Sequence, residues 1–323
     1  MLANVLYLSQ KDVVSVGLKM EKVIEALEKM FQKKGQGSVE MPPKIGIHPR
    51  GEAFIHAMPA YIPALKSAGI KWVSCFPKNQ ERELPYTTGL IILNNPETGL
   101  PLVIMDCAVI TALRTGAATA VAAKYLARPE SETVGILGCG VQGRSNLSAV
   151  NTLFPIKTVK AYDIVPQSQE KFAQEMEKSL GIEVKKVNSP AEALEGTDII
   201  VTAGPILKIP HATIKPGWME EGAFASSVDY DSYWSREALK EIDKFCTDDI
   251  SQLKSHQEMG YFQEIPSVHA DLGELVTGKK QGRENSRERT LACNLGLALD
   301  DMAVAPIVYE MAVKKGIGTW LPL

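Results

Sequence analysis

Three glycines have the spacing found in loops whose backbone N–H groups bind the phosphates of a nucleotide. Gly138, Gly140 and Gly143 form a G-x-G-x-x-G pattern that also contains Val141 and Gln142. In such a pattern the first glycine allows a tight turn, the second leaves room for a pyrophosphate, and the third lets a helix pack closely on a strand. Because the first N–H groups of that helix are unpaired and partly positive, we expect these five residues to bind a dinucleotide.

A carboxylate follows the glycine pattern at the distance where such proteins hold a ribose. Asp163 ends the apolar segment KAYD, twenty positions after Gly143. Its side chain can accept hydrogen bonds from the hydroxyls of the adenosine ribose and would repel a 2′-phosphate. We therefore predict NAD(H) as the cofactor in preference to NADP(H), and we add Thr115 to the predicted cofactor-binding residues.

Three cationic side chains stand in otherwise apolar segments. Lys44 lies in MPPKIGI, Lys71 in AGIKWVS and Arg114 in ITALRTGA. A charge with apolar neighbours is costly to bury unless it meets an opposite charge. If the three converge, they suit a carboxylate ligand, which arginine can bind through two hydrogen bonds. Taken singly, each is more often a snorkelling or salt-bridged residue.

The elements around the glycine pattern are those of a parallel sheet. After residue 128 the chain alternates between strands and helices: TVGILG, helix 141–154, TVKAYD, helix 166–180, EVKKV, a short helix ending at Gly196, TDIIVTAG, GAFASSV and DKFCTDD. This alternation predicts a doubly wound parallel sheet, which is an α/β Rossmann fold. The glycine pattern follows the first of these strands and opens a helix, and that context makes the pattern informative.

The residues before this region have a different texture. Residues 19–34 place apolar side chains on one helical face, and residues 41–106 contain short apolar runs between turn-rich segments. Together with an alanine-rich helical pattern at 111–126, they predict a second, α+β domain with a small antiparallel or mixed sheet. We assign residues 1–128 and 300–323 to this discontinuous substrate-binding and dimerisation domain, and 129–299 to the NAD-binding domain.

Composition and charge narrow the classes of partner. Lys and Arg number 35 against 38 Asp and Glu, so the net charge of −3 gives no general attraction to nucleic acid or to an anionic membrane. The five cysteines contain no C-x-x-C pair and the five histidines show no metal-ligand spacing, so we expect free thiols and no metal site. Without a basic leader or a run of about 18 apolar residues, the sequence predicts a soluble cytoplasmic protein.

Six segments carry a resemblance to a known family. They are MPPKIGIHPR, GIKWVSCFP, MDCAVITALRTGAATAVAAKYLA, GILGCGVQG, ADLGELVTGKKQGR and LGLALDDMAVAPIVYEMA. With them the sequence resembles the ornithine cyclodeaminase/mu-crystallin family, which includes archaeal-type alanine dehydrogenases and cyclic imine reductases. The resemblance implies a homodimer formed through the non-nucleotide domain. It also implies a substrate carboxylate held beneath the nicotinamide by Lys44, Lys71 and Arg114.

The resemblance further implies an acid–base aspartate shortly after the fifth strand of the nucleotide domain. Counting from Gly222 places Asp231 there, with Asp229 as the competing candidate. A carboxylate beside an imine carbon could activate water or move an amine proton if burial tunes its pKa. We name Asp231 and Lys71 as the catalytic residues.

Two departures from the family's pattern bear on the substrate. His56 stands where ornithine cyclodeaminases carry a glutamate suited to a distal amine, which counts against ornithine and favours a smaller, neutral or anionic side chain. We include His56 among the substrate-binding residues, with a hydrogen-bonded wall residue as the alternative. The usual G-x-D-x-P-G-K stretch is replaced by VDYDSYWS, so we expect a bulkier loop over the substrate, in which Tyr230, Tyr233 and Trp234 have no assigned role.

These features lead to one main hypothesis and two alternatives. The main hypothesis is an NAD(H)-dependent oxidoreductase acting at Cα of a small L-amino acid or its cyclic imine, like an alanine dehydrogenase or a pyrroline-carboxylate reductase. The first alternative is an ornithine or lysine cyclodeaminase that releases ammonia with catalytic NAD. The second is a mu-crystallin-like protein that binds NAD(P)H and a ligand without turnover.

Overall fold

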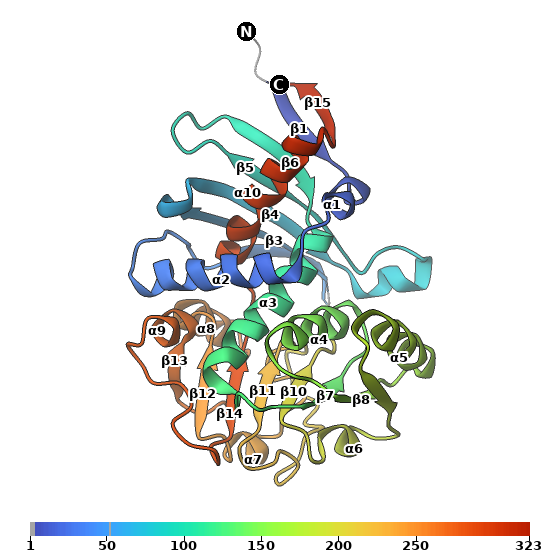
Figure 1. The fold of residues 1–323 in the computed structure, drawn as a ribbon. Coiled ribbons are helices and arrows are strands. Elements are labelled where there is room, and N and C mark those ends of the chain that lie inside the picture. The colour runs from blue at the N-terminus through green and yellow to red at the C-terminus, as the bar shows by residue number, and fades with distance from the viewer. Residues whose placement is uncertain (1–3, 52) are drawn as a thin grey trace. The chain divides into compact units, whose positions relative to one another are not determined.

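The computed structural model describes residues 4–51 and 53–323, which divide into two compact units (Figure 1). Unit 1 contains the residues up to 114 together with 297–323, and unit 2 contains 115–296. The helix α3 (Ala108–Leu126) therefore contributes residues to both units. Our boundaries after residues 128 and 299 would keep that helix in one domain, and they stay a prediction.

Unit 1 is built on a seven-stranded sheet in the order β15-β1-β6-β5-β4-β3-β2. Its strands are β1 (Asn4–Leu8), β2 (Ile45–Arg50), β3 (Ala53–Ile62), β4 (Ser67–Cys75), β5 (Thr87–Asn94), β6 (Pro101–Asp106) and β15 (Thr319–Pro322). Only β1 and β6 pair in parallel; the other neighbours are antiparallel. The expected α+β unit with a mixed sheet is confirmed.

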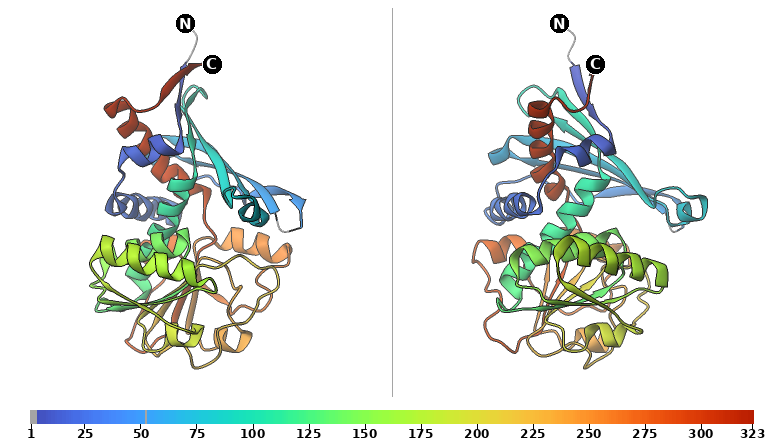
Figure 2. Two further views of the ribbon diagram at one scale, coloured as in Figure 1. Left: turned by 90° about the vertical axis from the view of Figure 1, so that its right-hand side faces the viewer. Right: turned by 45° about the vertical axis from the view of Figure 1, so that its right-hand side comes forward.

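Helices cover one face of this sheet, and none of the described helices of unit 1 packs on the other face. Unit 1 contains α1 (Gln10–Val16), α2 (Met20–Gly35), α10 (Ala298–Lys315) and two short 3₁₀ helices, η1 (Pro63–Leu65) and η2 (Pro77–Arg82). Helix α10 packs on β3, β4 and β5 and also contacts α2, as the views in Figure 2 show. Because side chains alternate along strands, register places Met58, Lys71, Ile91 and Met105 in one buried row across β3 to β6.

Unit 2 is a parallel sheet of eight strands in the order β13-β12-β14-β11-β10-β7-β8-β9. Its strands are β7 (Thr133–Leu137), β8 (Thr158–Tyr162), β9 (Glu183–Lys186), β10 (Ile199–Thr202), β11 (Phe224–Ser227), β12 (Lys244–Thr247), β13 (Val268–Asp271) and β14 (Thr290–Cys293). Its helices, besides α3, are α4 (Val141–Leu153), α5 (Pro166–Leu180), α6 (Pro190–Leu194), α7 (Arg236–Leu239), α8 (Ile250–Glu258) and α9 (Leu272–Val276). The expected doubly wound Rossmann fold is confirmed.

The strand order identifies where such a sheet binds ligands. From β7 the chain continues to β8 and β9 on one side, then returns to β10 and β11 on the other. This reversal makes a switch point between β7 and β10, and ligands of open α/β sheets bind at the carboxyl ends of the strands there. The glycine pattern directly follows β7, so it lies at this switch point.

Candidate functional site

The three glycines of the loop after β7 are required for two different reasons. Gly138 has φ +100°, and a Cβ there would lie 2.6 Å from the carbonyl oxygen of Ala203. A Cβ on Gly143 would lie 2.2 Å from the carbonyl oxygen of Gly138. Gly140, in contrast, caps α4, and a Cβ there would meet no described atom within 4 Å. Packing therefore explains the first and third glycines, whereas the open space at Gly140 fits a dinucleotide pyrophosphate.

Asp163 lies at the end of β8 and orders the glycine loop. One carboxylate oxygen accepts the N–H of Cys139 at 2.7 Å, and the other accepts the N–H of Val165 at 2.8 Å. A carboxylate has about four lone-pair positions, so Asp163 retains acceptors for ribose hydroxyls. Of the other predicted cofactor residues, Val141 and Gln142 begin α4, and Thr115 is buried on α3 next to Gly116, whose added Cβ would lie 2.4 Å from Ser145 of α4.

Arg144 was not among the predicted site residues, but it contacts the glycine loop from the first turn of α4. Its guanidinium donates to the carbonyl oxygens of Cys139 and Gly140 and forms an ion pair with Glu175 at 2.6 Å. The sequence signal was weak, because an arginine one position after the last glycine reads as an ordinary exposed helical residue.

The structure brings Lys71 and Arg114 together around two aspartates of α10. Lys71 Nζ lies 2.6 Å from Asp301 Oδ2, and Arg114 Nε lies 3.6 Å from Asp301 Oδ1. Arg114 also donates to Asp300 at 3.4 Å. All four side chains are buried, and burial lowers the pKa of Lys71, an effect that Arg114 adds to and Asp301 opposes. We call these four residues the buried ion cluster.

The buried ion cluster changes the expected electrostatics of a substrate site. The two cations are balanced by two carboxylates, so the group has no formal net charge, whereas the sequence suggested a surplus of cations. Among the described residues, Arg114 Nε has no acceptor within hydrogen-bond distance. A guanidinium carries five N–H donors, so Arg114 can still bind a carboxylate while Asp300 and Asp301 hold it in place.

The other two predicted substrate residues lie on neighbouring strands of unit 1. His56 pairs across the sheet with Val73, and its ring stacks on Phe54 with centroids 4.0 Å apart. Since Met58 pairs with Lys71, His56 shares the sheet face that carries Lys71. Lys44 is half-buried and directly precedes β2. A role for Lys44 and His56 in substrate binding stays a prediction.

The two competing aspartates follow β11 and are both buried. Asp229 accepts hydrogen bonds from Thr202 Oγ1 at 2.6 Å, Gly204 N–H at 2.8 Å and Ser227 Oγ at 3.0 Å. Asp231 accepts the backbone N–H of Phe262. Burial raises the pKa of each carboxyl to about 6, against the lowering effect of these hydrogen bonds. A carboxyl group with such a pKa can both bind and release a proton near neutral pH.

The aromatic residues beside these aspartates are packed inside unit 2. Tyr230 and Trp234 are buried, and the Tyr233 hydroxyl donates to the carbonyl oxygen of Pro205. Tyr230 and Trp234 belong to the hydrophobic core cluster of this unit. Packing in the core of unit 2 therefore accounts for two of the three aromatic residues of VDYDSYWS.

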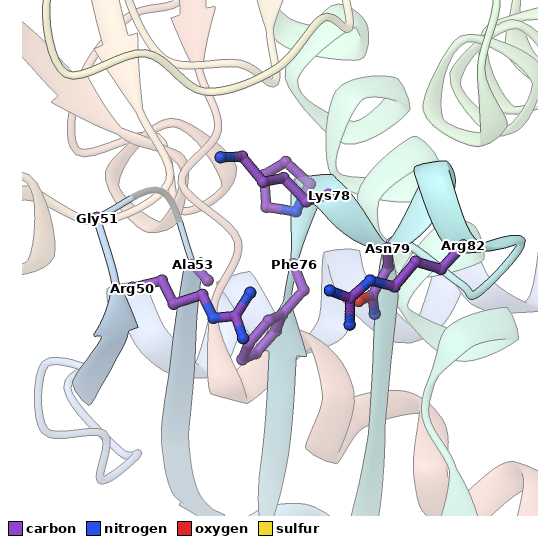
Figure 3. A pocket seen from close by; sticks show the side chains of 8 residues that line it. Arg50, Gly51, Ala53, Phe76, Lys78, Asn79 and Arg82 are labelled. Atoms are coloured by element: carbon purple, nitrogen blue, oxygen red, sulfur yellow. The ribbon is translucent and has the colours of Figure 1, made fainter.

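A cavity of about 280 Å³ lies elsewhere in unit 1, at the ends of β2 and β4. The cationic residues Arg50, Lys78 and Arg82 line it together with Phe76 and Asn79. In Figure 3 the side chains of Arg50 and Arg82 extend from opposite sides of this hollow. No predicted site residue lines it.

The described residues contain neither a group of metal ligands nor a helix that could span a membrane. Within 4–51 and 53–323, no three His, Cys, Asp or Glu side chains group so that they could hold a metal ion. In the same residues, no helix combines the length and apolarity needed to cross a bilayer.

The parallel sheet carries a glycine loop at its switch point, and the carboxylate of Asp163 directly follows the neighbouring strand β8. Together these features define an α/β protein of the dinucleotide-binding class. The chain belongs to the ornithine cyclodeaminase/mu-crystallin family, whose model matches residues 5–316. The resemblance found in the sequence is thereby confirmed.

Several relatives are similar over nearly the whole chain. An alanine dehydrogenase from Archaeoglobus fulgidus is 38% identical over 323 aligned positions, which span 97% of this chain and 97% of that one. The structure of Thermococcus litoralis Δ1-pyrroline-2-carboxylate reductase in complex with NADH and L-proline is 38% identical, with a TM-score of 0.88 over 97% of this chain and 99% of that one. An archaeal alanine dehydrogenase dimer with bound NAD is 35% identical, with a TM-score of 0.89 over 99% of this chain and all of that one.

Proposed function

We propose that this protein is an NAD(H)-dependent oxidoreductase acting at Cα of a small L-amino acid or of the corresponding imine. The main observation behind this proposal is the glycine loop at the switch point. There Gly140 leaves open space in front of the backbone, and Asp163 lies directly after β8. The buried ion cluster supplies a held arginine for a substrate carboxylate. Relatives more than 30% identical that are named alanine dehydrogenase and pyrroline-2-carboxylate reductase support this reaction class.

The nicotinamide, when bound, supplies the chemistry of accepting or donating a hydride at Cα. Arg114 binds and orients the substrate carboxylate, and Asp300 and Asp301 keep the guanidinium in place. Lys71 lies beside Arg114 in the cluster, where its ammonium can donate to the same carboxylate or to the reacting nitrogen. Orientation of this kind is a large part of enzymatic rate enhancement.

Asp231 is the proposed acid–base group, with Asp229 as the alternative. In the oxidative direction, the amine loses a proton as Cα is oxidised, and a carboxylate accepts it. The carboxyl group releases this proton to solvent, and the regenerated carboxylate takes a proton from the water that attacks the imine carbon. It then passes that proton to the nitrogen, so that ammonia leaves and a 2-oxo acid forms. A carboxyl with a pKa of about 6 can both accept and return a proton near neutral pH.

A substrate panel followed by NADH absorbance and ammonia assays tests this function. We expect NADH consumption with pyruvate plus ammonia or with Δ1-pyrroline-2-carboxylate, and NADH formation with L-alanine or L-proline and NAD. Ammonia release from ornithine or lysine without net NADH would instead indicate a cyclodeaminase. NADH binding without turnover on any of these compounds would contradict the proposed enzyme.

Changing Asp163 to asparagine tests the cofactor preference. The asparagine carbonyl oxygen can still accept the Cys139 N–H, so the glycine loop keeps that hydrogen bond, while the negative charge and the hydrogen bond from the Val165 N–H are lost. We expect the ratio of NADPH to NADH affinity to rise about 10-fold, because the repulsion of a 2′-phosphate disappears. Fluorescence titration with both cofactors measures the ratio; an unchanged ratio would remove Asp163 from the ribose site.

Changing Asp231 to asparagine is expected to raise stability at neutral pH while removing turnover. The folded-state pKa of about 6 lies above the ordinary value of 3.8, so the folded protein binds this proton more tightly than the unfolded chain does. The Asp231 carboxyl therefore lowers the unfolding free energy progressively as pH rises from 4 to above 6, by up to about 3 kcal/mol. Urea unfolding at pH 4 and pH 7.5 should show the Asp231→Asn variant gaining stability over wild type only at the higher pH.

The matched variant Asp229→Asn separates the two candidates. An amide at 229 would turn its NH₂ toward Thr202, Ser227 or the Gly204 N–H, all of which donate to the carboxylate, so we expect lower stability. For Asp231→Asn we expect kcat to fall about 10²- to 10⁴-fold. Wild-type turnover in Asp231→Asn together with inactive, folded Asp229→Asn would move the acid–base role to Asp229.

The proposed homodimer uses the uncovered face of the unit 1 sheet. Register places Ile45, Ala57, Trp72 and Leu90 in one row across β2 to β5, opposite the face packed by α10. Ile45 is 70% exposed and Trp72 46%, and an exposed apolar sheet face of this kind marks an interaction surface. Sedimentation analysis should give a dimer that Trp72→Glu dissociates.

We also place the protein in the cytoplasm, since its five cysteines are buried and none of them forms a disulfide.

A further inference from the structure

The residue between the two candidate aspartates has an unusual backbone conformation. Tyr230 has φ +65°, in the left-handed region that side chains other than glycine rarely adopt. Phe262, whose N–H binds the Asp231 carboxylate, has φ +53°. The two aromatic rings pack on each other with centroids 4.9 Å apart. Two backbone positions next to Asp231 are therefore strained, and such strain persists only where surrounding contacts enforce it.

A buried hydrogen bond joins the side chain of Tyr230 to that of His256. The Tyr230 hydroxyl lies 3.1 Å from His256 Nε2, and His256 Nδ1 lies 2.8 Å from the carbonyl oxygen of Gln252. A carbonyl can only accept, so Nδ1 carries a hydrogen. In the neutral ring Nε2 is then an acceptor, and the Tyr230 hydroxyl is its donor.

His256 also fixes the segment that carries Phe262. His256 lies on α8, and its carbonyl oxygen accepts the N–H of Tyr261 at 3.0 Å. Gln257 of the same helix donates to the carbonyl oxygen of Phe262 at 3.2 Å. Asp231 is thus held from both sides: through Tyr230 in its own chain segment, and through the Phe262 N–H from the end of α8.

We propose that Tyr230 and His256 are positioning residues for the acid–base carboxylate: their hydrogen bond holds the Asp229–Asp231 segment in its strained conformation. This inference rests on the proposed function for its catalytic part. The hydrogen bond assigns a role to an aromatic residue of the VDYDSYWS stretch that the reaction itself leaves unused. Neither residue contacts the reacting atoms in this scheme; each acts through Asp231 or Asp229.

The test compares Tyr230→Phe with Tyr261→Phe. Each change removes one hydroxyl and keeps the ring, and Tyr261 packs edge-on against Tyr230 in the same cluster. Hydrogen–deuterium exchange of the peptide containing residues 229–234 is measured without substrate. We expect at least 10-fold faster exchange in Tyr230→Phe and near wild-type exchange in Tyr261→Phe.

The second arm of the test measures steady-state kinetics, with a substrate that the wild type turns over. We expect kcat of Tyr230→Phe to fall at least 10-fold while the Kd for NADH changes less than 2-fold, and Tyr261→Phe to match wild type in both. A purely structural role would lower the melting temperature and leave kcat unchanged below it.

The two arms keep this inference separate from the proposed function. An inactive wild type refutes the proposed function, and the exchange arm still decides whether the hydrogen bond holds the segment. Unchanged exchange in Tyr230→Phe overturns the inference whatever the activity. Faster exchange with unchanged kcat in an active enzyme also overturns it.

Discussion

Replacing Lys71 by methionine is expected to lower the free energy of unfolding by about 3–5 kcal/mol and to abolish turnover. Methionine fills a similar volume, but the carboxylate of Asp301 then loses a partner 2.6 Å away in a site with no exposure. Removing one member of a buried ion pair leaves an uncompensated charge, which is among the most costly changes a protein core can undergo. Urea unfolding at pH 7 measures the loss.

The double variant Lys71→Met with Asp301→Leu distinguishes structural from catalytic loss. Replacing both charges of a buried pair by apolar groups is often nearly neutral, and Arg114 keeps Asp300 as its partner. We expect most of the stability to return while kcat/KM stays at least about 10³-fold below wild type, since the cluster's ammonium is still absent. Recovery of turnover along with stability would show that Lys71 only holds Asp301.

The part of this site that the sequence predicts is the part built from neighbouring residues. The glycine loop, the strand before it and the helix after it lie within one short segment, so spacing alone fixes their geometry. Gly138, Gly140 and Gly143 follow β7 as expected, and Asp163 directly follows β8. Local structure depends here on local sequence, and the prediction needs no knowledge of distant contacts.

The partners of Lys71 and Arg114 could not be predicted in the same way. Asp300 and Asp301 stand near the end of the chain, and only the return of α10 onto β3, β4 and β5 brings them to the cations. A signal was present in LALDDMAVA, where two adjacent aspartates interrupt an apolar helix and must find buried cations. Likewise β13 and β14, each of four residues, were not expected, because such short segments acquire their strand conformation from pairing in the sheet.

The aromatic stretch after β11 shows why side-chain roles depend on tertiary structure. The sequence places Tyr230 beside two candidate acids, in a loop expected to lie over the substrate, but it assigns no role to the side chain. The structure instead directs its ring toward His256 and Phe262, from a helix and a loop that follow later in the chain. A left-handed φ at a tyrosine leaves no signal in sequence, since glycine or asparagine is the residue expected there.

Changing Gly140 to alanine is expected to weaken NADH binding at least 10-fold, which is about 1.4 kcal/mol, with little loss of stability. A Cβ at this position meets no described atom within 4 Å, so the folded protein accommodates it. The cost to α4 is that of alanine replacing glycine as N-cap, about 1 kcal/mol or less. The new methyl group would point into the space where the pyrophosphate must approach the backbone.

Gly143→Ala is the matched comparison, because the same methyl group meets protein there instead. Its Cβ would lie 2.2 Å from the carbonyl oxygen of Gly138, and backbone on both sides leaves little freedom to move. We expect the free energy of unfolding to fall by about 1–3 kcal/mol, as in other overpacked sites. Thermal unfolding and NADH fluorescence titration of the two variants should therefore separate: loss of binding alone at 140, and loss of stability at 143. Wild-type NADH affinity in Gly140→Ala would mean that the dinucleotide phosphates do not lie over this loop.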